Sequence, residues 1–174
     1  MSSPTTHPST AQGTSTNTPA APTRPRPGLV DVRGPRFGAG VTSVLLIVTL
    51  ILGPWPGVIP LAIQTLAFAA GAILGVARQP YGLFFRHVVV PRITPPSEFE
   101  DAAAPRFAQG VGLVFAVVGL IAVTLSLPVL FYVAVAFALV AAGLNAAFGF
   151  CLGCEMYLLG KRLFGGSRTS TQLA

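Results

Sequence analysis

The sequence is poor in charge. Only 9% of its 174 residues are Asp, Glu, Lys or Arg, whereas a soluble domain carries roughly 25%. So few charges cannot cover a surface that faces water, and 52% of the residues are hydrophobic. The scarcity of charge therefore argues against an ordinary soluble domain and favours a protein whose solvent is lipid.

The few charges are mostly basic, but they do not form a cluster. The formal net charge is +6, from eleven Lys and Arg against five acids. Nucleic-acid-binding proteins usually present a clustered basic face, often with exposed aromatic residues. We find neither pattern and predict no nucleic-acid partner. The preference for Arg over Lys, with abundant Ala, Gly, Pro and Val, suggests a bacterial source.

The two ends of the chain lack apolar runs. Residues 1–29 are rich in Ser, Thr and Pro and cannot bury enough surface to offset the entropy of ordering. They also lack the 7–15-residue apolar stretch of a signal peptide, so we expect neither cleavage nor export on that account. We predict a disordered cytoplasmic tail over 1–29 and a flexible tail over 165–174.

Four stretches between the tails are apolar enough to span a bilayer as helices, which takes about 20 residues. The segment GPWPGVIP separates the first two stretches, and Pro128 separates the last two. We predict spans at about 37–53, 57–77, 107–127 and 128–150, with a middle loop over 78–106. The predicted fold class is all-α, an integral membrane bundle of four transmembrane helices in contact with the lipid bilayer.

The basic residues predict the orientation of this bundle. They precede the first span, lie between the second and third, or follow the fourth: Arg24, Arg26, Arg33, Arg36, Arg78, Arg86, Arg92, Arg106, Lys161, Arg162 and Arg168. The two other connections contain no charged residue. Because basic residues are retained on the cytoplasmic side, we predict a multi-pass protein of the bacterial plasma membrane with both termini and the middle loop in the cytoplasm.

A short motif occurs twice. PRFGAGV at 35–41 recurs as PRFAQGV at 105–111, and each copy begins a span. We interpret the bundle as two parallel helical-hairpin repeats, related by an axis along the membrane normal. The alternative is chance similarity between helices rich in Ala and Gly. The small residues along the spans predict close helix packing, in a compact bundle or a homodimer.

Cys151 and Cys154, followed by Glu155, are the candidate reactive site. Residues i and i+3 of a helix share a face, close enough for a disulfide or for two ligands of one metal. Three interpretations stay open: thiol redox or sulfur transfer, a metal half-site completed across a dimer, and structural cysteines. Zinc needs four ligands, and His87 is the only other candidate, so we predict no resident metal or cofactor.

The reactivity of the pair depends on where the fourth helix ends. If it ends at Cys151, the negative end of the helix dipole disfavours a thiolate. If Gly149 and Gly153 break the helix and a new one starts near Cys154, the free amides favour a thiolate. Glu155 is a candidate proton acceptor for a thiol, or a partner for Lys161 or Arg162.

Other polar residues have less specific interpretations. Gln64 and Asn145 are costly in hydrocarbon and are predicted to join helices, with substrate contact as the alternative. In the middle loop, LFFRHVVV is too short to span and is predicted to lie at the membrane interface. Ser97 and Glu100 have the spacing of a capping box that would start a short helix.

Three segments resemble a known family. They are DVRGPRF at 31–37, PPSEFEDAAAPRFAQGVGLVF at 95–115 and LNAAFGFCLGCEMYLL at 144–159. These segments are similar to the actinobacterial membrane proteins grouped as domain of unknown function 4395, over Val30 to about Leu163. The resemblance implies no established activity. Similar proteins are often encoded beside thioredoxin-like or sulfurtransferase proteins, which favours the thiol interpretation of Cys151 and Cys154.

The sequence thus predicts a membrane component of cytoplasmic thiol redox or sulfur metabolism. Its dithiol, Cys151 and Cys154 with Glu155 beside it, would exchange electrons or sulfur with a thioredoxin-like or sulfurtransferase protein. The alternative is a non-enzymatic scaffold or assembly subunit with structural cysteines. No complete catalytic constellation is present, so the sequence alone does not decide whether the protein is an enzyme.

Overall fold

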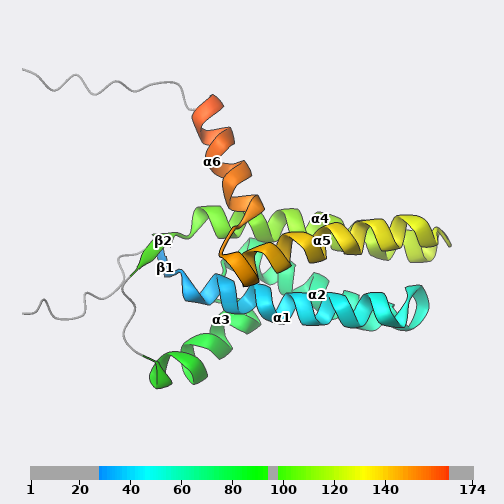
Figure 1. The fold of residues 1–174 in the computed structure, drawn as a ribbon, viewed down its shortest axis with the longest axis horizontal. Helices are drawn as coiled ribbons and strands as arrows, with labels where there is room; N and C mark the ends of the chain where they lie inside the picture. Colours follow the sequence, from blue (N-terminus) through cyan, green and yellow to red (C-terminus); the bar gives the residue numbers. More distant parts are fainter. Residues whose placement is uncertain (1–27, 94–97, 165–174) are drawn as a thin grey trace, which may run out of the picture.

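The computed structural model describes residues 28–93 and 98–164 (Figure 1). Four long helices run side by side: α1 (Arg33–Leu52), α2 (Pro54–Leu74), α4 (Ala103–Thr124) and α5 (Pro128–Phe148). Each is long and apolar enough to cross a membrane. The predicted all-α class with four apolar helices is therefore confirmed. The predicted tails lie outside the described residues, apart from Gly28 and Leu29.

Three of the four long helices, α1, α2 and α4, start earlier along the chain than the apolar pattern predicts. Pro35 and Pro105 lie in the first turns of α1 and α4, and Pro54 is the first residue of α2. Proline is tolerated there because its missing N–H has no partner within the helix. Gly53 joins α1 to α2 with φ at 74°, a conformation that suits glycine. These starts extend α1 and α4 beyond their apolar stretches to include Arg33, Arg36 and Arg106.

A small two-stranded sheet precedes the first and third helices. Strands β1 (Leu29–Asp31) and β2 (Phe99–Asp101) are antiparallel. The Asp31 Oδ1 atom accepts a hydrogen bond from the Arg33 N–H at 3.0 Å, and the Asp101 Oδ1 atom accepts one from the Ala103 N–H at 2.9 Å. Each strand therefore ends in an Asp that satisfies a free amide of the following helix.

The short helix predicted from the capping box does not form at Glu100. Ser97 lies outside the described residues, and Glu100 belongs to β2, where it pairs with Val30. Asp101 provides the side-chain acceptor instead. The sequence spacing was correct for a capping box, but the strand pairing with β1 holds Glu100 in an extended conformation.

The remaining elements lie at the same end of the bundle as the sheet (Figure 1). After α2 come α3 (Pro80–Phe84), the π-helix η1 (Phe85–Val89) and the 3-10 helix η2 (Val90–Arg92). After α5 comes α6 (Leu152–Phe164), which leaves the bundle at an angle. Leu158, Leu159 and Leu163 are exposed on α6, with Lys161 and Arg162 in its last turn. Such an amphipathic helix suits a membrane surface.

The core lies between the four long helices. Helix α1 packs against α5 and α2 packs against α4, in addition to the contacts within each hairpin. The buried core consists of Leu46, Leu61, Phe68, Ala116, Ala122, Val123, Phe131, Val135 and Ala138. By contrast, Ile51, Leu66 and Val129 are more than 70% exposed. The outer faces of the helices are thus apolar, as contact with lipid requires.

The burial of Glu100 gives a prediction about pH. Loss of solvent raises the pKa of its carboxyl above 4.5. Because the folded state disfavours the charged form, the contribution of this carboxyl to the free energy of unfolding should be most favourable at low pH. That contribution is lost as pH rises through the raised pKa. Glu100→Gln should therefore raise the melting temperature near pH 7 but not near about pH 4. The exposed Glu98→Gln is the control, and an equal gain at both pH values would contradict the prediction.

Candidate functional site

The two cysteines lie at the start of a separate helix. Helix α5 ends at Phe148, where Gly149 adopts the left-handed conformation with φ at 69°. Helix α6 begins at Leu152, so Cys151 precedes its first residue and Cys154 lies in its first turn. Of the two helix geometries that the sequence left open, the structure has the second in outline: Gly149 breaks the helix and a new one starts before Cys154, although Gly153 lies inside that new helix. The free amides at its start lie beside the cysteines.

Cys151 and Cys154 form a disulfide, with their Cα atoms 5.1 Å apart. The Cys154 N–H donates a hydrogen bond to the Cys151 Sγ atom at 3.3 Å. Cys154 is 9% exposed, whereas Cys151 is half-buried. The Glu155 side chain is exposed, and within the described residues it pairs with neither Lys161 nor Arg162. Cys151 is therefore the more exposed residue of the two.

Helix α6 is held against α4 by a very close contact. A Cβ atom added to Gly153 would lie 2.6 Å from both the Cα and the Cβ atom of Ala108. The rings of Phe107 and Tyr157 lie 5.8 Å apart one turn further along. The glycine between the two cysteines thus lets the start of α6 approach the backbone of α4. This contact positions the disulfide relative to the bundle.

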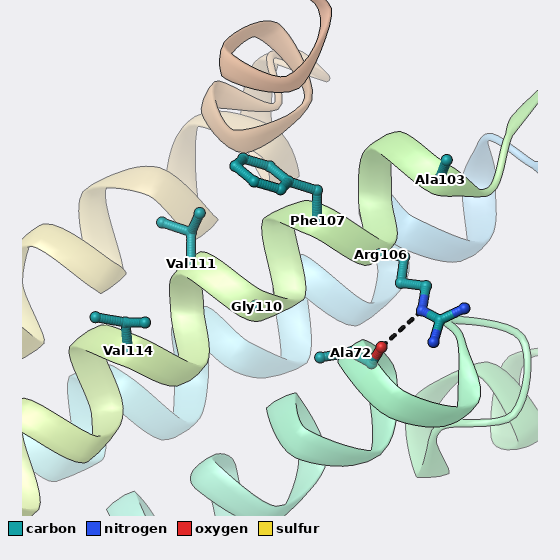
Figure 2. A pocket seen from close by; sticks show the side chains of 7 residues that line it. All are labelled: Ala72, Ala103, Arg106, Phe107, Gly110, Val111 and Val114. Atoms are coloured by element: carbon teal, nitrogen blue, oxygen red, sulfur yellow. Dashed lines mark hydrogen bonds between the residues drawn. The ribbon is translucent and has the colours of Figure 1, made fainter. Parts of the chain in front are cut away.

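The arginines of the two PRF motifs lie at helix C-termini. Arg106 donates from its guanidinium to the backbone oxygens of Ala72 and Ile73, at 2.6 and 2.8 Å. Figure 2 shows the hydrogen bond to Ala72, beside an open apolar groove along α4. Arg36 lies at the end of α5, since a Cβ on Gly149 would be 3.5 Å from its guanidinium carbon. Positive charge is favourable at these ends because the free carbonyls are electronegative.

A buried polar chain joins three helices near this end. The Gln64 Nε2 group donates to the Thr42 Oγ1 atom at 3.1 Å, and the Tyr81 hydroxyl donates to the Gln64 Oε1 atom at 2.9 Å. Gln64 is fully buried, and both ends of its amide are used within the protein. Burial also raises the pKa of Tyr81 and keeps its hydroxyl protonated. These contacts support the helix-joining interpretation of Gln64, whose partners the sequence pattern did not identify.

A cavity of about 250 Å³ opens beside the disulfide. Side chains from α1, α2, α4, α5 and α6 line it, together with Cys151. Its polar side chains include Thr42, Gln109 and Asn145. Asn145 is thus placed on a cavity wall, where the alternative interpretation of a substrate contact remains open. Sequence reasoning missed the cavity, although the presence of Gln109 in the PRFAQ motif was a signal.

The described residues do not form a larger cluster of metal ligands. No three His, Cys, Asp or Glu side chains within 28–93 and 98–164 come together as a group that could hold a metal ion. The His87 Nδ1 atom lies 2.9 Å from the backbone oxygen of Leu83, on the exposed surface. His87, the only other candidate ligand in the sequence, forms no such group with the cysteines among the described residues.

The four apolar helices define a bundle of the kind that integral membrane proteins form, with a cysteine pair at one end. The model of one family, Domain of unknown function (DUF4395), matches residues 30–162. The chain belongs to this family, as its sequence motifs predicted. Comparisons with curated proteins and with solved structures found no match.

Proposed function

We propose that the protein is a thiol–disulfide exchange component of the bacterial plasma membrane, with both termini in the cytoplasm. The basic residues support this orientation, because Arg33, Arg36 and Arg106 lie in the first turns of α1 and α4. Lys161 and Arg162 lie in α6, at the same end of the bundle. By the positive-inside rule this end faces the cytoplasm, so the disulfide is accessible to cytoplasmic partners.

The observation that carries the proposal is the geometry of the cysteine pair. Cys151 precedes a helix whose free amides stabilise negative charge, and the Cys154 N–H points to its sulfur. This arrangement favours a thiolate at Cys151 in the reduced state. Cys154 is more buried and acts as the resolving thiol. Glu155, next in sequence and exposed, accepts a proton as the pair is oxidised.

The reaction is exchange with a dithiol protein of the thioredoxin-like class or with a sulfurtransferase. A thiolate of the reduced partner attacks the Cys151 sulfur, the Cys151–Cys154 bond breaks, and Cys154 leaves as a thiolate. The second thiol of the partner then attacks the partner's own sulfur in the mixed disulfide, and Cys151 leaves as a thiolate. The partner ends as a disulfide, and this protein ends as a dithiol.

The second candidate function is a scaffold or assembly subunit whose cysteines only hold α6 in place. The burial of Cys154 and the close contact of Gly153 with Ala108 favour it. In that case removal of either cysteine lowers the melting temperature, while no thiol partner exchanges with the pair.

A redox titration of the full chain in lipid nanodiscs distinguishes the two. We expect a reversible two-electron transition, lost in Cys151→Ser and in Cys154→Ser. In inverted membrane vesicles, an impermeant maleimide should label Cys151 in the Cys154→Ser variant about tenfold faster than Cys154 in the Cys151→Ser variant, because Cys154 is buried. The absence of a reversible transition, with unfolding at lower temperature in both variants, would support the scaffold.

The arrangement of elements supports two further proposals. A strand, a long helix hairpin and a short helix occur in this order twice, with α3 and α6 as the short helices. Gln79 precedes α3 as Cys151 precedes α6. We infer that the bundle consists of two parallel repeats. A Cβ on Gly143 would meet nothing within 4 Å, so this face of α5 is open to a second copy in a homodimer.

A further inference from the structure

The cavity beside Cys151 has the properties of a site for a small lipid-soluble molecule. Its volume of about 250 Å³ is just below the range of roughly 300–1,000 Å³ found for ligand pockets, enough for a single ring. It lies between the long helices, and Cys151, Leu152 and Gly153 form its wall at the start of α6. A molecule in this cavity would therefore be next to the more exposed cysteine of the pair.

The cavity wall selects a neutral ligand. None of the residues that line it is Asp, Glu, Lys, Arg or His. Thr42, Gln109 and Asn145 are its polar lining residues, set among apolar neighbours. The rings of Phe115 and Phe137, also on the wall, lie 6.0 Å apart and nearly parallel. These surroundings suit a flat, uncharged ring that bears oxygen atoms able to accept hydrogen bonds.

The outer part of the cavity reaches the surface of the bundle. Phe137 and Met156 line it and are themselves 59% and 56% exposed. Both residues belong to helices that we place at the membrane, so a ligand would enter from lipid. A long apolar tail on the ligand would leave the cavity on this side.

We propose that this cavity binds a lipid-soluble quinone, which oxidises the reduced Cys151–Cys154 pair; the inference rests on the dithiol function proposed above. The Cys154 S–H bond breaks, its proton passes to Glu155, and the S–S bond forms with the Cys151 thiolate. Two electrons pass to the quinone, and its carbonyl oxygens take up one proton through Glu155 and one from water to become the hydroxyls of a quinol. A quinone is uncharged in both forms, as the cavity wall requires. Together with thiol exchange, this step moves two electrons from a cytoplasmic dithiol protein to the membrane quinone pool.

The test uses the full chain, reduced and then freed of reductant, in nanodiscs. The probes are decylubiquinone and dimethylnaphthoquinone, whose substituted ring positions resist thiol addition, and the readout is quinol formation with loss of free thiols. We expect one quinol for each disulfide. Ala141→Leu, which fills the cavity, should slow the reaction about tenfold. Val140→Leu, exposed and outside the cavity, is the matched control.

A second variant keeps the test valid if Ala141→Leu does not fold. Gln109→Leu has a similar size but no amide, and the loss of one hydrogen bond should weaken quinone binding by about fivefold to tenfold. The redox transition against dithiothreitol should be unchanged in both variants. The quinone site alone would be overturned if the redox transition against dithiothreitol is intact but no quinol forms. It would also be overturned if quinol forms and neither variant slows its formation. Loss of the transition in the unaltered protein would instead overturn the dithiol function.

Discussion

Gly153→Ala is expected to detach the start of α6 from α4. The added Cβ would lie 2.6 Å from the Cα and Cβ atoms of Ala108, and a backbone cannot yield as a flexible side chain does. Overpacking of this kind typically costs about 1–3 kcal/mol. We therefore expect a lower melting temperature in nanodiscs. The reduced Cys154, 9% exposed in the native protein, should also become more reactive toward maleimide.

Gly160→Ala is the matched control, because it lies in the same helix and its Cβ would meet nothing within 4 Å. Alanine is favoured over glycine inside a helix by roughly 0.5–1 kcal/mol, so this variant should be neutral or slightly stabilising. Equal behaviour of the two variants would show that α6 does not rest on α4 at this point. The position of the disulfide would then depend only on its connection to α5.

Gly57→Ala should destabilise the first hairpin. The new Cβ would lie 2.6 Å from the backbone oxygen of Thr49. Thr49 is itself fully buried, and its hydroxyl donates to the Leu45 backbone oxygen. The two helices must separate to admit a methyl group, so we expect a loss of about 1–3 kcal/mol in the free energy of unfolding. Thermal unfolding in nanodiscs measures it.

Gly40→Ala tests whether this cost comes from the contact. Gly40 lies in α1 of the same hairpin, and a Cβ there would meet nothing within 4 Å. Its replacement should leave the melting temperature unchanged or raise it slightly. A similar loss in both variants would mean that glycine is needed for another reason than the approach of α2 to α1.

The membrane-spanning character of the fold is a local property of the chain. Each long helix satisfies its own backbone hydrogen bonds, so twenty apolar residues between breaks such as Pro54 and Pro128 were sufficient to predict it. The family membership also followed from contiguous motifs, among them the segment around Cys151 and Cys154. The chemistry of the cysteine pair was less well determined, because it depends on where α5 ends.

The position of the disulfide and the cavity beside it depend on contacts between segments that are far apart in the sequence. Gly149 ends α5 and α6 starts at Leu152, where Gly153 can approach Ala108, a residue far away in the sequence. The cavity beside Cys151 likewise needs five helices at once. Hydropathy and spacing describe one segment at a time, so the sequence determined the long helices, their apolar character and the cysteine pair. Only the packing of helix on helix placed that pair beside a neutral cavity.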